Sequence, residues 1–290
     1  MMNEKRDICK AYNAHAAEYT QAAKVQHEIG DRLFERLFYL KIKPRYVLDL
    51  GCGPGIFSQR LKKHFPEAQL VGLDLAYAML KQAKVHQNWR CKWGLVNADM
   101  TALPFPDGLF DVVFANQAIH WANPLSAVIG EINRVMAPGG CLMFSTLGPD
   151  TFSELRQAFS TADKYAHVHD FPDMHDVGDC LMAEYFLDPV VDMEMLTAHF
   201  ATLPKLLHAL KLQGVRNINA ARNPGLTGKQ SWRTFEDAMA VRCTPEGKFP
   251  LTYEVVYGHA WKGAQRRTKK GVETLISVAA LKLDMGIKGV

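Results

Sequence analysis

The chain has 290 residues, of which 48% are hydrophobic and 22% charged, and its formal net charge is +4. These values are ordinary for a globular protein that buries a full core, and the charge is too small to indicate nucleic-acid binding by itself. No run approaches the roughly eighteen apolar residues of a membrane helix. The charged N-terminus is unlike a signal or transit peptide, and six scattered cysteines without a C-x-x-C pair are typical of reduced thiols in a cytosol.

Hydrophobic patterns predict alternating strands and helices through residue 146, after an amphipathic helix near the N-terminus. In chain order these elements are a helix over 24–40, a strand over 46–50, a helix over 56–64, a strand over 70–73, a helix over 76–84, strands over 93–97 and 110–115, a helix over 124–136 and a strand over 141–145. Such alternation indicates an α/β fold with a mostly parallel sheet and helices on both faces. Ligands of such sheets bind at the carboxyl ends of the strands.

The regular alternation ends after residue 146. Residues 147–186 are rich in Asp, His and Met, and we interpret them as an insertion that caps the site. Beyond it the patterns predict a strand over 190–196, a helix over 205–213, a loop over 217–230, a helix over 232–241 and a closing strand over 252–261. We divide the chain into an N-terminal helical lid (1–44), a ligand-binding core (45–146), a cap with the last strands of the same domain (147–262), and a basic tail (263–290).

The glycine-rich turn after the strand over 46–50 is the most informative stretch of the chain. It reads Asp-Leu-Gly-Cys-Gly-Pro-Gly over residues 49–55, and Asp74 ends the next strand, where a carboxylate can accept hydrogen bonds from ribose hydroxyls. The spacing is G-x-G-x-G, with Ile56 where a dinucleotide fold has its third glycine, and no Lys-Ser/Thr pair follows for a phosphate. Together with the acidic Asp49, this favours S-adenosylmethionine over NAD or ATP. An ordinary strand–helix turn is the alternative.

Polar and aromatic side chains also follow the third and fourth predicted strands. Asp99 and Met100 come after the third strand, where they could accept from an adenine amino group and cover the ring; an Asp that merely caps a turn is the alternative. Asn116, with Gln117, His120 and Trp121, lies just beyond the fourth strand, so we expect these side chains to face the pocket. Trp121 could equally be a core anchor beneath the following helix.

Taken together, these motifs resemble the class I S-adenosylmethionine-dependent methyltransferases over about residues 45–146. The resemblance rests on residues 49–55, Asp74, the pair at 99–100, the Leu-Pro-Phe and Phe-Asp-Val-Val motifs over 103–113, and Pro-Gly-Gly over 138–140. It implies a Rossmann-like sheet of seven strands and S-adenosylmethionine as the cofactor. By position, the cofactor-binding residues would be Gly51, Gly53 and Gly55 at the methionine part with Asp49 near its positive charge, Asp74 at the ribose, Asp99 and Met100 at the adenine, and Asn116 beyond the fourth strand.

The flanking segments resemble a narrower family, the malonyl-acyl-carrier-protein O-methyltransferases of biotin synthesis. The matching stretches are residues 11–19, 145–158, 169–179 and 188–194, so this resemblance extends over nearly the whole chain through Trp261. It implies methylation of the free carboxylate of a malonyl thioester carried by acyl carrier protein. Because that carboxylate is already ionised at neutral pH, we expect no general base, no triad and no metal. Positioning and the exclusion of water would carry the catalysis.

Four side chains are candidates for this positioning. Tyr19 lies on the N-terminal segment, where we expect it to order the lid and to touch cofactor or substrate, and Trp121 is expected to face the pocket. His175 or Arg156 could meet the malonyl carboxylate. For each of them a packing or surface role is the alternative. The segment 167–179 holds three His and four Asp, but it lacks a recognised ligand spacing, so we expect no metal there.

Partners are predicted from a basic run near the C-terminus. We interpret this run, Lys262, Arg266, Arg267, Lys269 and Lys270, as a docking site for the acidic carrier protein. A solvated tail is the alternative, and RNA is disfavoured because no aromatic residue interrupts the run. Other functions remain open: a methyltransferase for small molecules such as quinone precursors or carboxylates, and an assembly factor that modifies or only binds a partner protein. We expect no nucleic-acid or membrane partner and a cytoplasmic location.

Overall fold

The computed structural model describes residues 2–215, 217, 221–223, 225, 227–263, 265–268 and 271–274. The N-terminal half contains α1 (Met2–Ala22), α2 (Lys24–Arg36), the short helix η1 (Leu37–Tyr39), β1 (Tyr46–Leu50), α3 (Ile56–His64), β2 (Gln69–Asp74), α4 (Tyr77–Val85), β3 (Gly94–Asn97), β4 (Phe110–Asn116), the short helix η2 (Ile119–Trp121), α5 (Leu125–Val135) and β5 (Met136–Leu147). The rest contains α6 (Ser153–Ser160), α7 (Met174–Ala183), β6 (Phe186–Phe200), α8 (Leu203–Leu212), α9 (Lys229–Ala240), β7 (Phe249–Lys262), β8 (Gln265–Thr268) and β9 (Gly271–Thr274).

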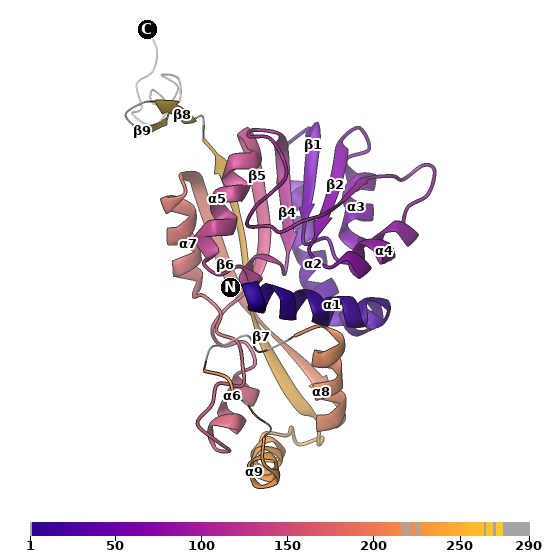
Figure 1. Cartoon of the computed structure of the whole chain (residues 1–290), viewed down its shortest axis with the longest axis vertical. Helices are drawn as coiled ribbons and strands as arrows, with labels where there is room; N and C mark the ends of the chain where they lie inside the picture. Colours follow the sequence, from indigo (N-terminus) through magenta and orange to yellow (C-terminus); the bar gives the residue numbers. More distant parts are fainter. Residues whose placement is uncertain are drawn as a thin grey trace.

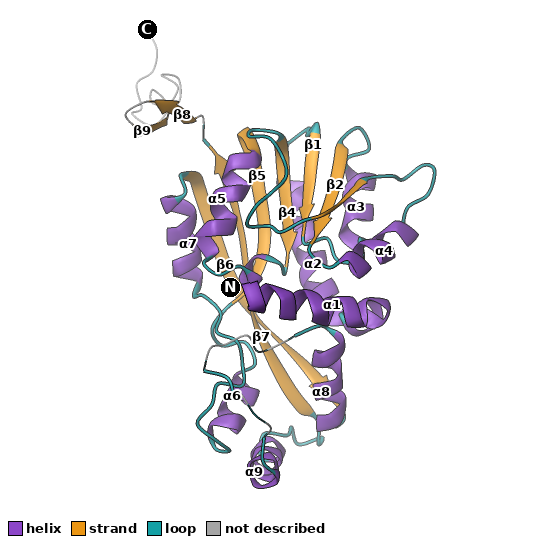
Figure 2. Cartoon of the chain, viewed as in Figure 1, coloured by secondary structure: helices purple, strands orange, loops and turns teal. Residues whose placement is uncertain are grey.

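Seven strands form one sheet in the order β3-β2-β1-β4-β5-β7-β6 (Figure 2). The strands β1 to β5 pair in parallel, whereas β7 runs antiparallel to both β5 and β6. This arrangement confirms the predicted α/β fold with a mostly parallel, seven-stranded sheet. The predicted strands over 190–196 and 252–261 lie inside β6 and β7, which are both longer than the patterns indicated.

Both faces of the sheet are buried, because alternate residues of its central strands enter two separate hydrophobic cores. On one face, α2 and α3 pack on the side of β1 that carries Val47. On the other face, α5 and α7 pack on the side that carries Leu48 and Leu50. Burial on both faces explains why β1 and β4 read as nearly continuous apolar runs in the sequence.

The strands β6 and β7 extend beyond the carboxyl ends of the parallel strands, and α6, α8 and α9 gather around this extension (Figure 1). The helix α6 packs against α9, while α7 packs against β6 and α5 as an ordinary sheet helix. Within the segment 147–186, which we interpreted as one capping insertion, α6 therefore lies beside α9, and α7 lies on the sheet. The reason is that α7 has an apolar face, with Val177 and Leu181 fully buried, that the sheet covers.

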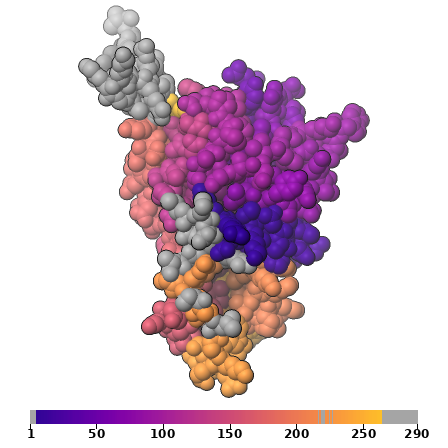
Figure 3. Space-filling view, in the orientation of Figure 1, coloured from indigo at the N-terminus to yellow at the C-terminus, as the bar shows by residue number. Residues whose placement is uncertain are grey.

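The N-terminal helix α1 crosses the carboxyl ends of the parallel strands, between the sheet and the cap formed by α6, α8 and α9 (Figures 1 and 3). It packs against α4 and α8. None of the helices in the described ranges combines the length and the apolar character that crossing a bilayer requires.

The chain leaves the sheet at the edge opposite α1. The strand β7 is antiparallel to β5. Its residue Val255 pairs with Leu147 at the end of β5, and its residue Trp261 pairs with Cys141 in the first half of β5. Those six residues correspond to roughly 20 Å of strand. The hairpin of β8 and β9 follows at that opposite edge (Figure 1).

Candidate active site

The glycine-rich turn forms the floor of a cavity of about 800 Å³ at the carboxyl ends of β1 and β2. Gly51 and Gly53 line this first cavity, and both have positive φ, 71° and 52°. A Cβ built on Gly53 would meet nothing within 4 Å, so the missing side chain leaves open space beside the backbone. The structure therefore gives a ligand direct access to the turn, as the glycine spacing predicts.

Gly55 has another environment. It is absent from the described lining of the cavities, and a Cβ there would meet Ala83 of α4 at 2.8 Å and Trp93 at 3.2 Å. Its lack of a side chain lets the turn pack closely against α4. The structure thus assigns this glycine to packing, and its predicted contact with the methionine part does not follow from the geometry.

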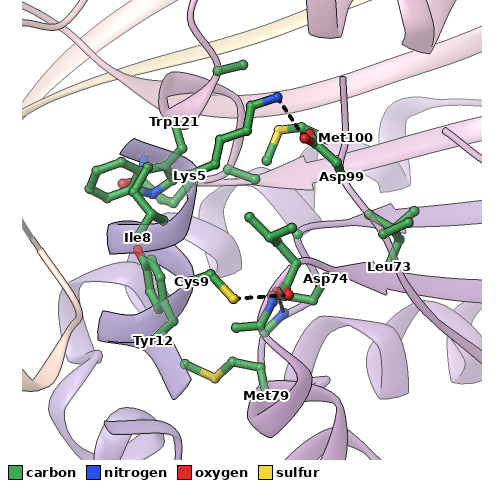
Figure 4. A pocket seen from close by; sticks show the side chains of 18 of the residues that line it. Lys5, Ile8, Cys9, Tyr12, Leu73, Asp74, Met79, Asp99, Met100 and Trp121 are labelled. Atoms are coloured by element: carbon green, nitrogen blue, oxygen red, sulfur yellow. Dashed lines mark hydrogen bonds and ion pairs between the residues drawn. The ribbon is translucent and has the colours of Figure 1, made fainter. Parts of the chain in front are cut away.

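Asp74 ends β2 and lies in the wall of the first cavity (Figure 4). Its two carboxylate oxygens accept hydrogen bonds from the backbone N–H groups of Gly53, at 2.9 Å, and Ala76, at 2.8 Å. Burial raises its pKa to about 6, although both hydrogen bonds act to lower it. Each oxygen keeps a second lone pair, so the oriented carboxylate can still accept from two ligand hydroxyls.

Asp49 lies beneath the turn and is only 2% exposed. It lines a smaller cavity of about 390 Å³, together with Gly51, Gly53 and Asn116, which also line the first cavity. Burial raises the pKa of Asp49 to about 7, against the opposing effect of the hydrogen bond that Ser58 donates. A buried carboxylate with little compensation is stabilised by a nearby positive charge, as a cationic ligand would provide.

Asp99 and Met100 also line the first cavity (Figure 4). Asp99 accepts hydrogen bonds from Lys5 of α1, at 2.7 Å, and from the backbone and side chain of Thr101. Burial acts to raise the pKa of Asp99, but the donors Lys5 and Thr101 outweigh it and hold the pKa below its usual range. The loop that was predicted to hold an adenine is thereby tied to the N-terminal helix.

The helix α1 covers the first cavity through polar contacts along one of its faces. Besides Lys5, the thiol of Cys9 donates to the carbonyl of Leu75 at 3.5 Å, and Asn13 accepts from the backbone N–H of Ala78 at 2.7 Å. Figure 4 shows Lys5, Ile8, Cys9 and Tyr12 facing the cavity from this helix. These contacts tie α1 to the loops that follow β2 and β3.

A second cavity of about 870 Å³ lies under the cap. Its lining combines apolar side chains of α6, α8 and β7 with amides and imidazoles, and the polar members are Gln26, Gln117, His120, His167, His169, Gln213 and Asn217. The two large cavities share four lining residues, Tyr12, Tyr19, Gln117 and Trp121. We call these four side chains the junction. Tyr19 lines all three cavities.

Aromatic contacts hold the junction together. The ring of Tyr12 lies 6.0 Å from both Tyr19 and Trp121, and Trp121 stacks on His169 with an interplanar angle of 15°. Gln117 directly follows β4 and has φ of 53°, which is uncommon for a residue other than glycine and costs about 1 kcal/mol or more. The predicted positions of Tyr19 and Trp121 therefore converge at the boundary between the two cavities.

His175 and Arg156 lie elsewhere, although both were candidates for the malonyl carboxylate. His175 stands exposed in the first turn of α7, where its ring bonds Asp173 at 2.6 Å. Arg156 pairs with Asp170 on the outer side of α6. Neither side chain is part of the described lining of the two large cavities. His175 thus contacts the capping residue of α7, and Arg156 belongs to an ion pair.

The segment 167–179 has structural partners for several of its His and Asp residues. His167 bonds both carboxylate oxygens of Asp163, and Asp173 caps the N-terminus of α7. His169 stacks on Trp121, as described above. Several of the His and Asp side chains that resembled metal ligands in the sequence therefore have partners within the protein.

Lys262 also has a structural role. Its Nζ donates to the carbonyls of Asn133 and Met136, at 2.6 and 2.7 Å, at the C-terminal end of α5. This is where a cation stabilises the unpaired carbonyls of a helix. Its contact with a carrier protein stays a prediction. Arg266 and Arg267 lie in β8, at the edge opposite the cavities, and Lys269 and Lys270 lie outside the described residues.

Several lining residues were absent from the predicted site. Lys5, Tyr12 and Gln26 come from α1 and α2, which lack any recognised cofactor motif. Tyr12 and Tyr19 are seven residues apart and thus share one helical face, which was a usable signal. His120 follows Asn116 closely in sequence and was expected to face the pocket, and it lines the second cavity.

The first cavity fits an adenosyl ligand with an amino-acid tail. Gly53 leaves open space beside the backbone, and Asp74 presents oriented acceptor oxygens. The smaller cavity beside Asp49 continues it past the glycine turn. Asn116 lines both spaces and is fixed by Ser145, whose hydroxyl donates to it at 2.7 Å.

Comparison with known proteins agrees with this geometry. Residues 48–144 match the family model described as a methyltransferase domain. Among solved structures, the YcgJ protein of Bacillus subtilis aligns with a TM-score of 0.57 at 15% identity, covering 79% of this chain and 97% of that one. A phosphoethanolamine N-methyltransferase from Haemonchus contortus, solved with S-adenosylhomocysteine, aligns with a TM-score of 0.50 at 17% identity over 80% of this chain and 52% of that one. These likenesses show the fold.

Curated relatives match almost end to end. A malonyl-[acyl-carrier protein] O-methyltransferase of Legionella pneumophila is 61% identical over 96% of this chain and 98% of its own length. A protein of the same name from Gallionella capsiferriformans is 42% identical over 92% of this chain and 94% of its own length. The chain is therefore an S-adenosylmethionine-dependent methyltransferase, and it belongs to the malonyl-[acyl-carrier protein] O-methyltransferase family.

Proposed function

We propose that this enzyme methylates the free carboxylate of a malonyl thioester carried by acyl carrier protein, an early step of biotin synthesis. The names of the relatives, which match over nearly the full length, support this substrate. The observation that carries the proposal is the meeting of two cavities at Tyr12, Tyr19, Gln117 and Trp121. One cavity fits the cofactor, and the other can admit an acyl thioester up to the point where the methyl group is transferred.

The reaction needs no acid or base catalysis by the protein. When bound, the cofactor supplies an electrophilic methyl group on a positively charged sulfur. A malonyl carboxylate is ionised at neutral pH and is itself the nucleophile, so no residue needs to remove a proton. The protein's contribution is to hold one carboxylate oxygen in line and to exclude water, and such positioning is worth roughly 7–11 kcal/mol.

The site residues have distinct proposed roles in this arrangement. Asp74 holds the ribose, and Asp99 and Met100 hold the adenine. Gly51 and Gly53 approach the methionine part, with Asp49 and Asn116 beside it. Their positions around the first cavity and its smaller extension support these roles.

The N-terminal helix α1 acts as a lid in this proposal. Tyr19 is the residue of α1 that lines every cavity, and Lys5, Cys9 and Asn13 fasten the helix to the loops beyond β2 and β3. The lid excludes water from the junction and orders Tyr19 against cofactor and acceptor. The cap of α6, α8 and α9 encloses the acyl arm, and its apolar lining suits the methylene groups of that arm.

Transfer of a labelled methyl group tests the proposal. The enzyme is incubated with methyl-labelled S-adenosylmethionine and with malonyl, succinyl or acetyl carrier protein. We expect label on the malonyl protein alone, and we expect mild base to release it as an ester. Absence of label from malonyl carrier protein, or label only on a small quinone-type acceptor, would replace this proposal.

A further inference from the structure

The junction carries no formal charge. Its four side chains, Tyr12, Tyr19, Gln117 and Trp121, are two phenols, an amide and an indole. Among the described residues that line the second cavity, none is Asp, Glu, Lys or Arg. An anionic acceptor that reaches the junction therefore meets neutral hydrogen-bond donors and apolar surface in this part of the chain.

Three titratable side chains, Tyr12, Tyr19 and His120, stay neutral at physiological pH. Burial raises the pKa of Tyr12 and of Tyr19 well above the usual value, so both hydroxyls remain protonated donors. Burial, assisted by the nearby His169, lowers the pKa of His120 to about 3, so this imidazole is uncharged. The Nδ1 atom of His120 is buried and has no hydrogen-bond partner within the described part of the chain.

A carboxylate is poorly stabilised by such a lining alone, because neutral donors replace only part of its hydration. The described lining of the first cavity includes one cationic residue, Lys5, and its charge is paired with that of Asp99 at 2.7 Å.

We infer that the acceptor carboxylate finds its positive partner in the bound cofactor, and that the neutral side chains of the junction and His120 orient the carboxylate without an ion pair to any described residue that lines the two large cavities. This inference rests on the proposed function. It makes acceptor binding depend on the charge of the methyl donor, because opposite charges attract strongly where water is excluded.

The same arrangement explains release of the products. In the transfer a carboxylate oxygen forms a bond to the methyl carbon, the carbon–sulfur bond breaks, and its electron pair stays on sulfur. No proton moves, and both charges disappear together. The neutral ester and the neutral thioether then lose their mutual attraction, whereas an Arg or Lys in the site would have remained charged.

Binding measurements with non-reacting ligands test this inference on the full chain. Titration calorimetry measures the affinity of malonyl carrier protein with no cofactor, with neutral S-adenosylhomocysteine, and with an analogue in which a protonated amine replaces the sulfonium. We expect malonyl carrier protein to bind at least about tenfold more tightly with the charged analogue than with S-adenosylhomocysteine. Acetyl carrier protein, which lacks the carboxylate, is the control, and its affinity should be the same with the charged analogue and with S-adenosylhomocysteine. Equal malonyl affinity with both ligands would overturn the inference.

Two variants of His120 test the neutral donor. His120→Asn keeps an N–H near the position of Nδ1, whereas His120→Leu removes it. We expect His120→Leu to bind malonyl carrier protein more weakly in the presence of the charged analogue, with unchanged affinity for the analogue itself. We expect His120→Asn to keep most of the affinity for malonyl carrier protein. Equal losses in both variants would remove His120 from the inference.

A third variant covers a cation outside the described residues. Arg216 adjoins the lining residues Val215 and Asn217 in sequence. If Arg216→Gln abolished malonyl binding while the charged analogue gave no advantage, a cation of the protein would hold the carboxylate, and the inference would fail. Methyl transfer to malonyl carrier protein would then still support the proposed function. If the unmodified enzyme neither bound malonyl carrier protein nor transferred a methyl group to it, the proposed function itself would be contradicted.

Discussion

At the scale of single residues, the site depends on carboxylates that burial keeps partly protonated. The pKa of Asp74 is raised to about 6 and that of Asp49 to about 7, with burial as the main cause in each case. Both side chains lie next to the glycine turn, where the sequence motif places them. The motif predicted their positions, because strand ends and glycine spacing are local features. It did not predict their protonation, which depends on packing from α3 and α4.

Removal of the Asp74 carboxylate is expected to weaken cofactor binding. Asp74→Ala should lower the affinity by about 1–3 kcal/mol, because buried polar partners are left unpaired. Calorimetric titration with S-adenosylhomocysteine measures the loss. Asp176→Ala, at an exposed position of α7, is the matched control and should bind normally. An unchanged affinity in Asp74→Ala would place the ribose elsewhere.

The same carboxylates predict the pH dependence of cofactor binding. Their folded pKa values lie above the usual 3.8, so the free protein takes up protons on folding, and its stability falls as pH rises from about 4 to about 7. Binding of a cation favours the ionised forms. We therefore expect affinity for S-adenosylmethionine to rise between pH 5 and 7, by at most about tenfold per pH unit for each group. Calorimetric titrations at several pH values measure this affinity. In Asp49→Asn the rise of the affinity near pH 7 should become smaller. A pH-independent affinity would contradict it.

At the scale of elements, the sequence predicts the parallel strands better than the segments that enclose the site. Glycine and proline turns delimit β1 to β5, and their apolar runs are buried on both faces. The long β6 alternates exposed and partly buried residues, so its ends were missed. The segment 147–186 was assigned to the cap by composition, whereas the apolar face of α7 places that helix on the sheet. Contacts of α1 with the cofactor cavity join residues about ninety positions apart in sequence, as in the pair Lys5–Asp99, and periodicity carries no information on such pairs.

The contact between α1 and the loop after β3 predicts how firmly the lid holds the cofactor. Lys5→Met removes the bond to Asp99 while it keeps the length of the side chain. The pair is about one-third exposed on each side, so its contribution is small, about 0–1 kcal/mol. We expect cofactor dissociation to accelerate by at most about fivefold, as measured by stopped-flow fluorescence. Lys10→Met, on the exposed side of α1, serves as the control. Identical dissociation rates in all three proteins would show that Lys5 does not fasten the lid.

At the scale of the whole molecule, the direction of β7 separates β8, which carries Arg266 and Arg267, from the active site. The cavities lie at the carboxyl ends of the parallel strands, and β7 carries the chain to the other edge before β8 begins (Figure 1). Charge clustering in the sequence suggested a docking role for the run from Lys262 to Lys270. The sequence alone could not reveal that one strand reverses direction and removes this run from the site.

Neutralising the tail should therefore leave catalysis intact. For Arg266→Gln/Arg267→Gln we expect the KM for malonyl carrier protein to stay within about twofold of the unmodified value, since the interaction of charges over more than a Debye length is largely screened at physiological salt. Steady-state kinetics at low and at physiological ionic strength measure this. A selective rise of KM for the carrier protein, without a change for a small malonyl thioester, would restore the docking role of the tail.

The shared wall of the two large cavities has a consequence for inhibition. Since Tyr19 faces both spaces, a single compound that joins an adenosine to a pantetheine-like arm through a short tether would fill them at once. Tethering raises the effective concentration of the second half to the millimolar range. Such a bisubstrate compound should bind far more tightly than either fragment, and it would discriminate against methyltransferases in which the acceptor approaches from another side.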